Sequence, residues 1–387
     1  MIRHLFKLMW KRRGSNFLLT VEIAASALVL FAVYSLAIAN LKTFMAPMGF
    51  NDKDVWLVEF EREPGIQLDS GYVGNAQLQI TNTPGVKKFA LTATNAPFMV
   101  SHMIQTTAAH AGRTREVFLY QTDPHFAEVL EMPLEEGRWF GKQDEVGHLL
   151  PIVINEVLKN ELFGPATANG QTIEIDKQLY RVVGVVGPYK VDHEFQSPRA
   201  AAFVPIPASS KNDVRVIVRV DDADGQTEAR LMANLAPLQP GVKPSCEALT
   251  EKRLTQRQLN ITPIFIAVGI CLFLIINVVL GLVGVFWQSI TRRRTEIALR
   301  RSVGATARDV VRQLVGEAWL ITTFAVSLIL GAVVLFPIMG LLGTAPSTYW
   351  LAIGGMLVTL YGLVTLSVLY PSRLASAIQP TEALRAE

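Results

Sequence analysis

The sequence has few cysteines, and the two that it has lie in regions of different character. Cys246 is in a long polar region of the chain, whereas Cys271 is inside an apolar run. We therefore expect no disulfide between them, and the polar region has to be stabilised by a hydrophobic core. A region of about 215 residues is long enough to bury such a core.

Charged residues are missing from several long stretches. Only 18% of the residues are Asp, Glu, Lys or Arg, whereas a soluble domain has about 25%. Residues 17–39 hold one charge, Glu22, and residues 263–287 and 318–370 hold none. A membrane span needs about 20 apolar residues, and a polar break at 343–347 divides the last stretch. The sequence therefore predicts four transmembrane helices.

Patterns typical of a catalytic centre are also missing. The six histidines are scattered, without the spacing of metal ligands. The segment 164–172 faintly resembles a phosphate-binding loop, but it has one residue too many between its glycines and no lysine. The second, third and fourth spans have no Asp, Glu, Lys, Arg or His, which argues against ion-coupled transport through their centre. We expect no catalytic residue, no cofactor site and no metal site in this chain.

Arginine, in contrast, is concentrated in one short segment. Seven arginines lie between Ser289 and Glu317, at positions 292, 293, 294, 300, 301, 308 and 312. Short positively charged loops stay in the cytoplasm, so this segment is predicted to lie on the cytoplasmic side of the membrane. The first 16 residues, with five positive and no negative charges, predict the same side. The net charge of +3 therefore reflects topology and does not indicate binding to nucleic acid.

These signals place both termini in the cytoplasm. The expected organisation is a cytoplasmic N-terminus at 1–16, spans at 17–41, 261–287, 319–340 and 350–370, an outer domain with its stalk at 42–260, a cytoplasmic elbow at 288–318, a short outer loop at 341–349 and a cytoplasmic tail at 371–387. The apolar run of the first span is longer than the core of a signal peptide, so we expect it to be retained. Glu22 inside this span either reaches the inner surface or pairs with another helix.

The outer domain is predicted to mix strands and helices. Strands are expected at 55–60, 86–92, 115–120, 151–154, 171–175, 180–186 and 214–220, and helices near 126–130, 156–164 and 225–238. Asn155 occupies a helix N-cap position, and Asp176 and Lys177 form a turn. This order favours an α+β domain of two lobes between the first two spans. Residues 246–260 are compatible with a helical stalk or with an ordinary linker.

The elbow carries the signals of two helices joined by a tight turn. Glu296 has an arginine four residues away on each side, which stabilises an exposed helix. Gly304 fits the left-handed position that ends a helix, and Thr306 with Asp309 matches the capping box that begins the next. Such an elbow either transmits force between two spans or serves as a positive anchor on anionic lipid. The pattern alone leaves both interpretations open.

Two inner motifs resemble the MacB/FtsX superfamily of ABC transporter permeases. The first runs from Thr295 to Glu317 and contains TEIALRRSVGAT, and the second covers residues 370–385 in the tail. In the outer domain, residues 135–140, 162–164 and 182–186 resemble the extracytoplasmic domain of the same family. The resemblance extends over essentially the whole chain. It implies a membrane protein of four transmembrane helices with a large extracytoplasmic α+β domain of two lobes between helices 1 and 2.

The resemblance also implies a mechanism. In this family an ATPase lies beneath the elbow, two permease copies pair, and stalk helices carry the movement to the outer domain, where the substrate is handled. Because only 16 residues precede the first span, we expect the ATPase to be a separate chain that binds ATP-Mg, and this chain not to be an enzyme. The resemblance implies an ATPase-coupling site at Glu296, Arg300, Arg301, Gly304 and Asp309.

Further partners follow from the same resemblance. They are a second permease, identical or a sister chain, membrane lipid and, in a bacterium with two membranes, a periplasmic adaptor and an outer-membrane channel. The expected location is the bacterial inner membrane, and the expected function is export. The alternative is regulation of cell-wall hydrolases, as in the cell-division members of the superfamily. A membrane-anchored binding module without a motor is disfavoured by the continuous elbow.

Overall fold

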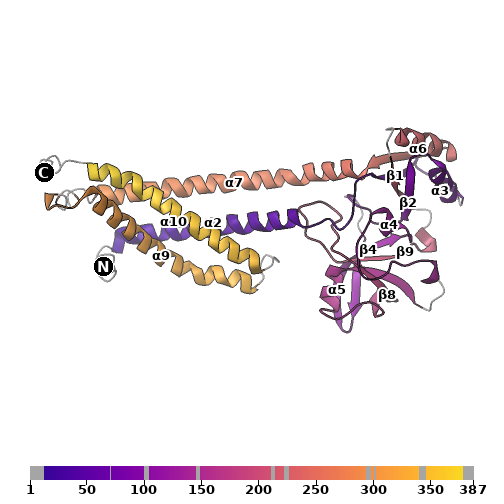
Figure 1. The fold of residues 1–387 in the computed structure, drawn as a ribbon, viewed down its shortest axis with the longest axis horizontal. Helices are drawn as coiled ribbons and strands as arrows, with labels where there is room; N and C mark the ends of the chain where they lie inside the picture. The colour runs from indigo at the N-terminus through magenta and orange to yellow at the C-terminus, as the bar shows by residue number, and fades with distance from the viewer. Residues whose placement is uncertain are drawn as a thin grey trace. The chain divides into compact units, whose positions relative to one another are not determined.

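The computed structural model divides into two compact units, drawn in Figure 1. One unit comprises Met1–Lys42 and Pro263–Glu387, and we call it the bundle. The other is Thr43–Thr262, the region predicted as the outer domain. The structure describes all residues except 1–12, 70, 100–103, 145–148, 211–213, 222–225, 293–296, 298, 300–301, 340–345 and 378–387.

Four long helices form the bundle. They are α2 (Arg13–Met45), α7 (Leu249–Thr291), α9 (Ala307–Met339) and α10 (Pro346–Ala377). Each contains a stretch that is long and apolar enough to cross a membrane, so the predicted number of spans is confirmed. Buried apolar residues from all four helices form one core, with Ile23, Leu282, Ala325 and Leu360 among them. The helices extend beyond the predicted spans, most of all α7, which begins at Leu249.

Two contacts in the bundle depend on glycine. The carboxylate of Glu22 lies so close to α7 that a Cβ atom at Gly281 would come within 2.2 Å of it. The side chain of Glu22 therefore lies against the backbone of α7. The ring of Tyr34 lies against Gly355 of α10 in the same way, at 2.8 Å from the position of a Cβ atom. Small residues allow helix backbones to approach closely in this manner.

The first lobe of the outer domain is an antiparallel sheet of four strands. Its order is β11 (Val242–Ala248), β1 (Val55–Arg62), β10 (Arg215–Val220) and β2 (Val86–Thr92). Helices α3 (Tyr72–Asn82) and α6 (Thr227–Leu235) cover one face, where Ile80 and Leu231 pack on Val58, Val216 and Val218. The opposite face is buried as well, because Leu57 and Ile217, which alternate with these valines along the strands, belong to a second core.

The second lobe is a small closed barrel. Its strands are β3 (Gln105–His110), β4 (Arg113–Thr122), β6 (Leu150–Asn155), β7 (Thr172–Ile175), β8 (Gln178–Val186) and β9 (Ala201–Pro205), with β5 (Leu134–Gly137) paired to β8. The order β4-β3-β7-β8-β6-β9 closes because β9 also pairs with β4. Helix α5 (Glu156–Leu162) packs on this barrel, and the short α4 (Phe126–Val129) follows β4. The two lobes share one strand contact, between Thr92 and Thr122.

Of the two interpretations of residues 246–260, the structure supports the helix that leads into the second span. This helix, α7, begins at Leu249, whereas Cys246 still belongs to strand β11. Cys246 pairs with Val58 across the sheet. Both cysteines are free. Three short 3-10 helices complete the described elements, at Lys142–Asp144, Ala208–Ser210 and Ala236–Leu238.

Candidate functional site

The elbow between α7 and α9 is the candidate functional site. It contains the five residues proposed from sequence to face an ATPase. The structure describes Gly304 and Asp309, whereas Glu296, Arg300 and Arg301 lie outside the described residues.

The turn has the backbone conformation that the sequence predicts. Gly304 has a φ of +106°, in the region that glycine adopts without steric cost. Two residues later, the amide of Asp309 donates to Oγ1 of Thr306 at 3.2 Å, and the amide of Thr306 donates to a carboxylate oxygen of Asp309 at 3.2 Å. This reciprocal pair is a capping box, and it satisfies amide groups that the first turn of α9 leaves free. The predicted stop and start signals are confirmed.

A small apolar cluster holds the two sides of the elbow together. Ile290 at the end of α7 and Ile297 pack against Val310 and Leu314 of α9. Ile290, Ile297 and Val310 are each less than 7% exposed. Because these contacts lie on both sides of the turn, they restrict the angle between the two arms. The elbow is thus a packed helix–turn–helix unit.

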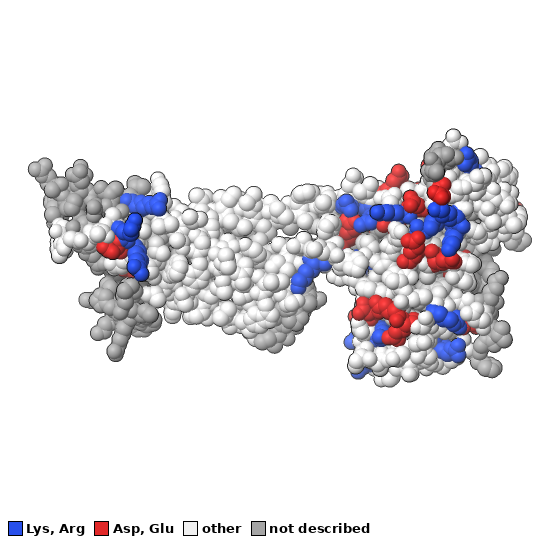
Figure 2. All heavy atoms as spheres, in the orientation of Figure 1, with Lys and Arg blue, Asp and Glu red and all other residues white. Residues whose placement is uncertain are grey.

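The outer surface of the elbow is partly apolar and strongly basic. Leu299 is 58% exposed and Val303 is 84% exposed, and Arg308 and Arg312 at the start of α9 are exposed as well. Figure 2 shows basic side chains gathered at this end of the bundle, whereas the sides of the bundle are almost free of charge. Sequence reasoning missed Leu299 and Val303. The available signal was that both are apolar residues in a charged motif and do not belong to the buried cluster.

Polar contacts link the start of α9 to the other helices of the bundle. The indole of Trp319 donates to Thr365 at 2.9 Å, and the hydroxyls of Thr323 and Tyr361 lie 2.7 Å apart, both between α9 and α10. The hydroxyl of Tyr34 on α2 lies 2.6 Å from that of Thr359 on α10. Hydrogen bonds between membrane helices contribute about 0.6–2 kcal/mol each. These hydrogen bonds connect α9 with α10 and α10 with α2.

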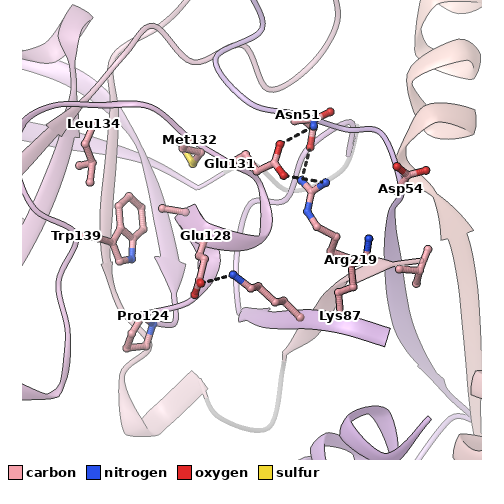
Figure 3. Close-up of a pocket in the computed structure, with 13 residues that line it drawn as sticks. Asn51, Asp54, Lys87, Pro124, Glu128, Glu131, Met132, Leu134, Trp139 and Arg219 are labelled. Atoms are coloured by element: carbon pink, nitrogen blue, oxygen red, sulfur yellow. Dashed lines mark hydrogen bonds and ion pairs between the residues drawn. The ribbon is translucent and has the colours of Figure 1, made fainter. Parts of the chain in front are cut away.

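The outer domain contains a cavity of about 770 Å³ with a mixed lining. Figure 3 shows Trp139, Met132 and Leu134 on one side and charged residues on the other. Lys88 forms an ion pair with Glu128, and Arg219 lies 3.4 Å from a carboxylate oxygen of Glu131. Among the described residues, no group of His, Cys, Asp or Glu is arranged to hold a metal ion. The cavity can receive an amphipathic group, but its charges are largely paired with each other.

Two known families match this chain. The MacB-like periplasmic core domain matches residues 20–234, and the FtsX-like permease C-terminal domain matches residues 267–380. Together they cover most of the chain and leave out residues 1–19, 235–266 and 381–387, among them β11 and the first part of α7. They agree with the resemblance that the inner and outer motifs indicate.

Named relatives are similar over most of this chain. The macrolide export ATP-binding/permease protein MacB of Wolinella succinogenes is 26% identical over 302 residues, which is 73% of this chain and 45% of that protein. The pyoverdine export ATP-binding/permease protein PvdT of Pseudomonas aeruginosa is 25% identical over 370 residues, which is 86% of this chain and 51% of that protein. The chain thus spans about half the length of the curated relatives that it matches.

Solved structures of isolated outer domains are also similar. The periplasmic region of MacB from Actinobacillus actinomycetemcomitans aligns with a TM-score of 0.41 and 15% identity, covering 57% of this chain and 98% of that one. The extracellular domain of YknZ, from Gram-positive bacteria, aligns with a TM-score of 0.37 and 15% identity, covering 49% and 99%. The two family matches carry the assignment: this chain belongs to the MacB/FtsX family of ABC transporter permeases, with a MacB-like periplasmic core domain and an FtsX-like C-terminal region.

Proposed function

We propose that this chain is the permease subunit of an ATP-driven exporter, and that its elbow couples a separate ATPase to movement of the outer domain. ATP-Mg would be bound and hydrolysed by the ATPase, which docks on the cytoplasmic side. The elbow would receive the displacement, and the helices of the bundle would carry it across the membrane. The relatives named above are exporters by name, and their names support export as the task of this chain.

The packed elbow is the observation that carries this proposal. An anchor on lipid needs positive charge but no fixed angle between its two helices. Here the turn is closed by Gly304, capped by Thr306 and Asp309, and packed through Ile290 and Val310. Such a unit transmits displacement because its arms cannot rotate independently without opening an apolar core. This favours force transmission over the anchor, the two interpretations that the sequence left open.

The docking surface would combine charge with apolar contact. We propose Glu296, Arg300, Arg301 and Asp309 as the charged contacts with the ATPase. The exposed Val303 adds an apolar residue at the tip of the elbow. Protein interfaces combine an apolar centre with a polar rim, and arginine is enriched in them. A second permease, identical or a sister chain, would complete the transporter, and a periplasmic adaptor with an outer-membrane channel would complete the export path in a bacterium with two membranes.

Replacement of Gly304 by valine tests the coupling role. A β-branched residue at a φ of +106° is strongly disfavoured, so the turn has to rearrange. We expect Gly304→Val to insert and to bind its ATPase, but to lose the stimulation of ATP turnover by the assembled transporter, together with export. Gly316→Val is the matched control, because Gly316 has open space around its Cβ position and an ordinary backbone conformation. Normal coupled turnover in Gly304→Val would refute the proposal.

A further inference from the structure

Three charged residues are almost completely buried where the chain enters and leaves the outer domain. Lys190 is 1% exposed, and Asp52 and Glu194 are each 4% exposed. Lys190 and Glu194 belong to the loop between β8 and β9, whereas Asp52 belongs to the segment between α2 and β1. Buried charges are costly unless each finds a partner. We call these three residues, with Arg253 and Arg257 of α7, the base junction.

Lys190 forms hydrogen bonds with backbone carbonyl groups at the end of α2. Its ammonium donates to the carbonyl oxygen of Ala46 at 2.7 Å, to that of Thr43, and to that of Glu194 at 3.2 Å. The carbonyl groups at the end of a helix lack partners within the helix and carry partial negative charge, so a lysine satisfies them well. The ring of Phe44 stacks on Phe195 of the same loop, with ring centres 5.4 Å apart. The loop is therefore attached to the end of α2 by polar and apolar contacts.

The backbones of the two segments also touch. The amide of Lys190 donates to the carbonyl oxygen of Met48 at 2.9 Å. Gly49 has a φ of +86°, and a Cβ atom there would lie 1.8 Å from the carbonyl oxygen of Pro188. Any side chain at this position would force the loop away from the end of α2.

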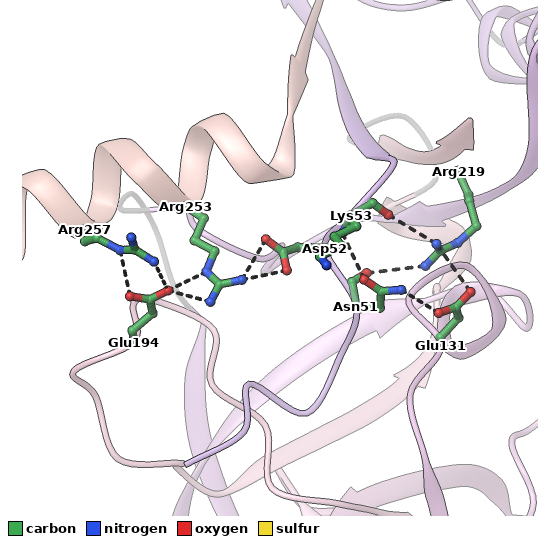
Figure 4. A network of polar contacts seen from close by, with 8 residues as sticks. All are labelled: Asn51, Asp52, Lys53, Glu131, Glu194, Arg219, Arg253 and Arg257. Carbon is green, nitrogen blue, oxygen red and sulfur yellow. Dashed lines mark hydrogen bonds and ion pairs between the residues drawn. The ribbon is translucent and has the colours of Figure 1, made fainter. Parts of the chain in front are cut away.

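Glu194 binds two arginines in the first turns of α7. Its carboxylate accepts hydrogen bonds from Nε of Arg253 at 2.7 Å and from Nε of Arg257 at 2.8 Å. The two arginines are four residues apart, so they lie on one face of the helix. Arg253 also donates to the carboxylate of Asp52 at 2.9 Å, as Figure 4 shows. One acidic side chain of the loop thus binds the same helix twice.

Residues 51–53, which include Asp52, are connected by hydrogen bonds to the wall of the cavity. Arg219 donates to the carbonyl oxygens of Lys53 at 3.2 Å and of Val129 at 2.8 Å. The side-chain amide of Asn51 donates to Glu131 at 2.7 Å. Figure 4 shows this chain of contacts running from α7 through residues 51–53 to Arg219 and Glu131, which also line the cavity of Figure 3.

We propose that the base junction is the device that delivers displacement of α2 and α7 to the cavity wall at α4 and Glu131. This inference rests on the proposed function, because it specifies where the movement enters the outer domain. Breaking a buried ion pair by removing one partner leaves an uncompensated charge, which costs several times more than loss of a surface pair. The ends of α2 and α7 therefore move together with the loop and with residues 51–53. Lys190 and Glu194 act as positioning residues.

Hydrogen exchange of the full transporter tests this proposal. The permease is purified from its native membrane with the ATPase that accompanies it, and exchange is followed without nucleotide and with ATP-Mg and vanadate. In the native protein, we expect the exchange rate of residues 126–132 to change by about twofold or more between the two states, because exchange reports local opening. The elbow, at 302–312, is the reference segment on the ATPase side.

Two variants break the junction to different degrees. Glu194→Gln removes the shared charge, and Arg257→Gln removes only its outer partner, whose side chain is 38% exposed. Both should lose most of the nucleotide response at 126–132 while the response at the elbow persists and basal ATP turnover stays within about twofold of native. Arg257→Lys keeps the charge and should restore part of the response. Glu63→Gln is the control, because Glu63 pairs with Lys243 on the exposed surface of the same domain.

The outcomes separate this inference from the function on which it rests. A response at 126–132 that persists in both Glu194→Gln and Arg257→Gln would overturn the base junction as the delivery device. If nucleotide changes the exchange rate of the native protein at the elbow but not at residues 126–132, the base junction is overturned as the delivery device as well. The proposed function would then stand. Absence of any nucleotide response at the elbow would refute the proposed function, and this inference would fall with it. A change in thermal stability alone, with the response intact, would make the junction a structural contact only.

Discussion

Asn155 is a buried polar residue that connects helix α5 to residues 199–201 of the outer domain. Its side-chain oxygen accepts from the amides of Leu158 at 3.1 Å and Ala201 at 3.0 Å, and its amide donates to the carbonyl of Arg199 at 2.7 Å. The sequence predicts the first contact, because asparagine before a helix is a cap. The contacts with residues 199 and 201 join segments over 40 positions apart, and no local pattern reveals them.

We predict that Asn155→Ala strongly destabilises the outer domain. Asn155 is fully buried, and alanine would remove the cap and leave the amide of Ala201 and the carbonyl of Arg199 without this partner. The expected loss is about 2–4 kcal/mol in the free energy of unfolding. Urea unfolding of the full chain in detergent, monitored by tryptophan fluorescence, measures it. The exposed Asn160 offers the control, Asn160→Ala, and equal stability of the two variants would contradict the role of Asn155.

We predict that Glu194 makes stability depend on pH in the acidic range. Burial favours the neutral carboxyl, but the hydrogen bonds from Arg257 and Arg253 outweigh it and hold the pKa of Glu194 below its usual value of 4.5. A carboxyl with a lowered folded pKa stabilises the protein fully above its unfolded pKa and loses that contribution as the pH falls through the folded pKa. The difference in unfolding free energy between native protein and Glu194→Gln should therefore be constant above about pH 5 and shrink below it.

Thermal unfolding of both proteins in detergent from pH 3.5 to 7 measures this difference. Asp192, two residues away, acts in the opposite sense, because burial raises its pKa. It is present in both proteins, so its effect largely cancels from the comparison. A difference that grows on acidification would contradict the prediction.

At the scale of elements, the strands and helices with strong local signals were predicted well. The strand expected at 86–92 is β2, with the same bounds, and the helix after Asn155 is α5. Asp176 and Lys177 both have positive φ angles, in agreement with the predicted turn. These elements combine apolar alternation with caps or turn residues, so their signal is contained in the segment itself.

Elements without such a signal were missed. Strand β9 is buried along most of its length and rich in alanine, so its residues do not alternate. Strand β3 contains threonine, alanine and histidine, and its partners β4 and β7 determine its pairing. Helix α3 begins after Gly71 without a side-chain cap. The neighbours in the fold, rather than the segments themselves, stabilise these three elements.

Two adjacent glycines of α10 provide a prediction for the bundle. Gly355→Ala would place a Cβ atom 2.8 Å from the ring of Tyr34, whereas Gly354→Ala meets nothing within 4 Å. We expect the first change to destabilise the bundle by about 1–3 kcal/mol, because a rigid ring cannot yield without moving α2. The second should be neutral or slightly stabilising, since alanine favours helix. Unfolding of the two variants in mixed micelles compares them directly, and equal stability would contradict the packing of Tyr34.

At the scale of the whole molecule, topology is the central expectation. We predict that the elbow faces the cytoplasm and the outer domain the opposite side, as the arginine distribution indicates. Single cysteines at Val303 and Leu179, which are 84% and 51% exposed, are placed in a chain whose Cys246 and Cys271 are alanine. A membrane-impermeant maleimide applied to intact spheroplasts should label Leu179→Cys at once and Val303→Cys only after the membrane is opened. Immediate labelling at position 303 would reverse the proposed orientation.

Local patterns in the sequence were enough to predict the number of spans, the capped glycine turn of the elbow and most strands of the outer domain. Each of these follows from residues close together in the chain: apolar length, charge next to a span, a cap or an alternation. Three features became evident only in the folded chain: β9 closes a barrel, Glu22 lies against a glycine of α7, and Lys190 and Glu194 connect the ends of two helices. These contacts join residues distant in the chain, and a lone lysine or glutamate in a loop carries no local sign of burial. The partner that makes such a charge stable is found only when the chain is folded.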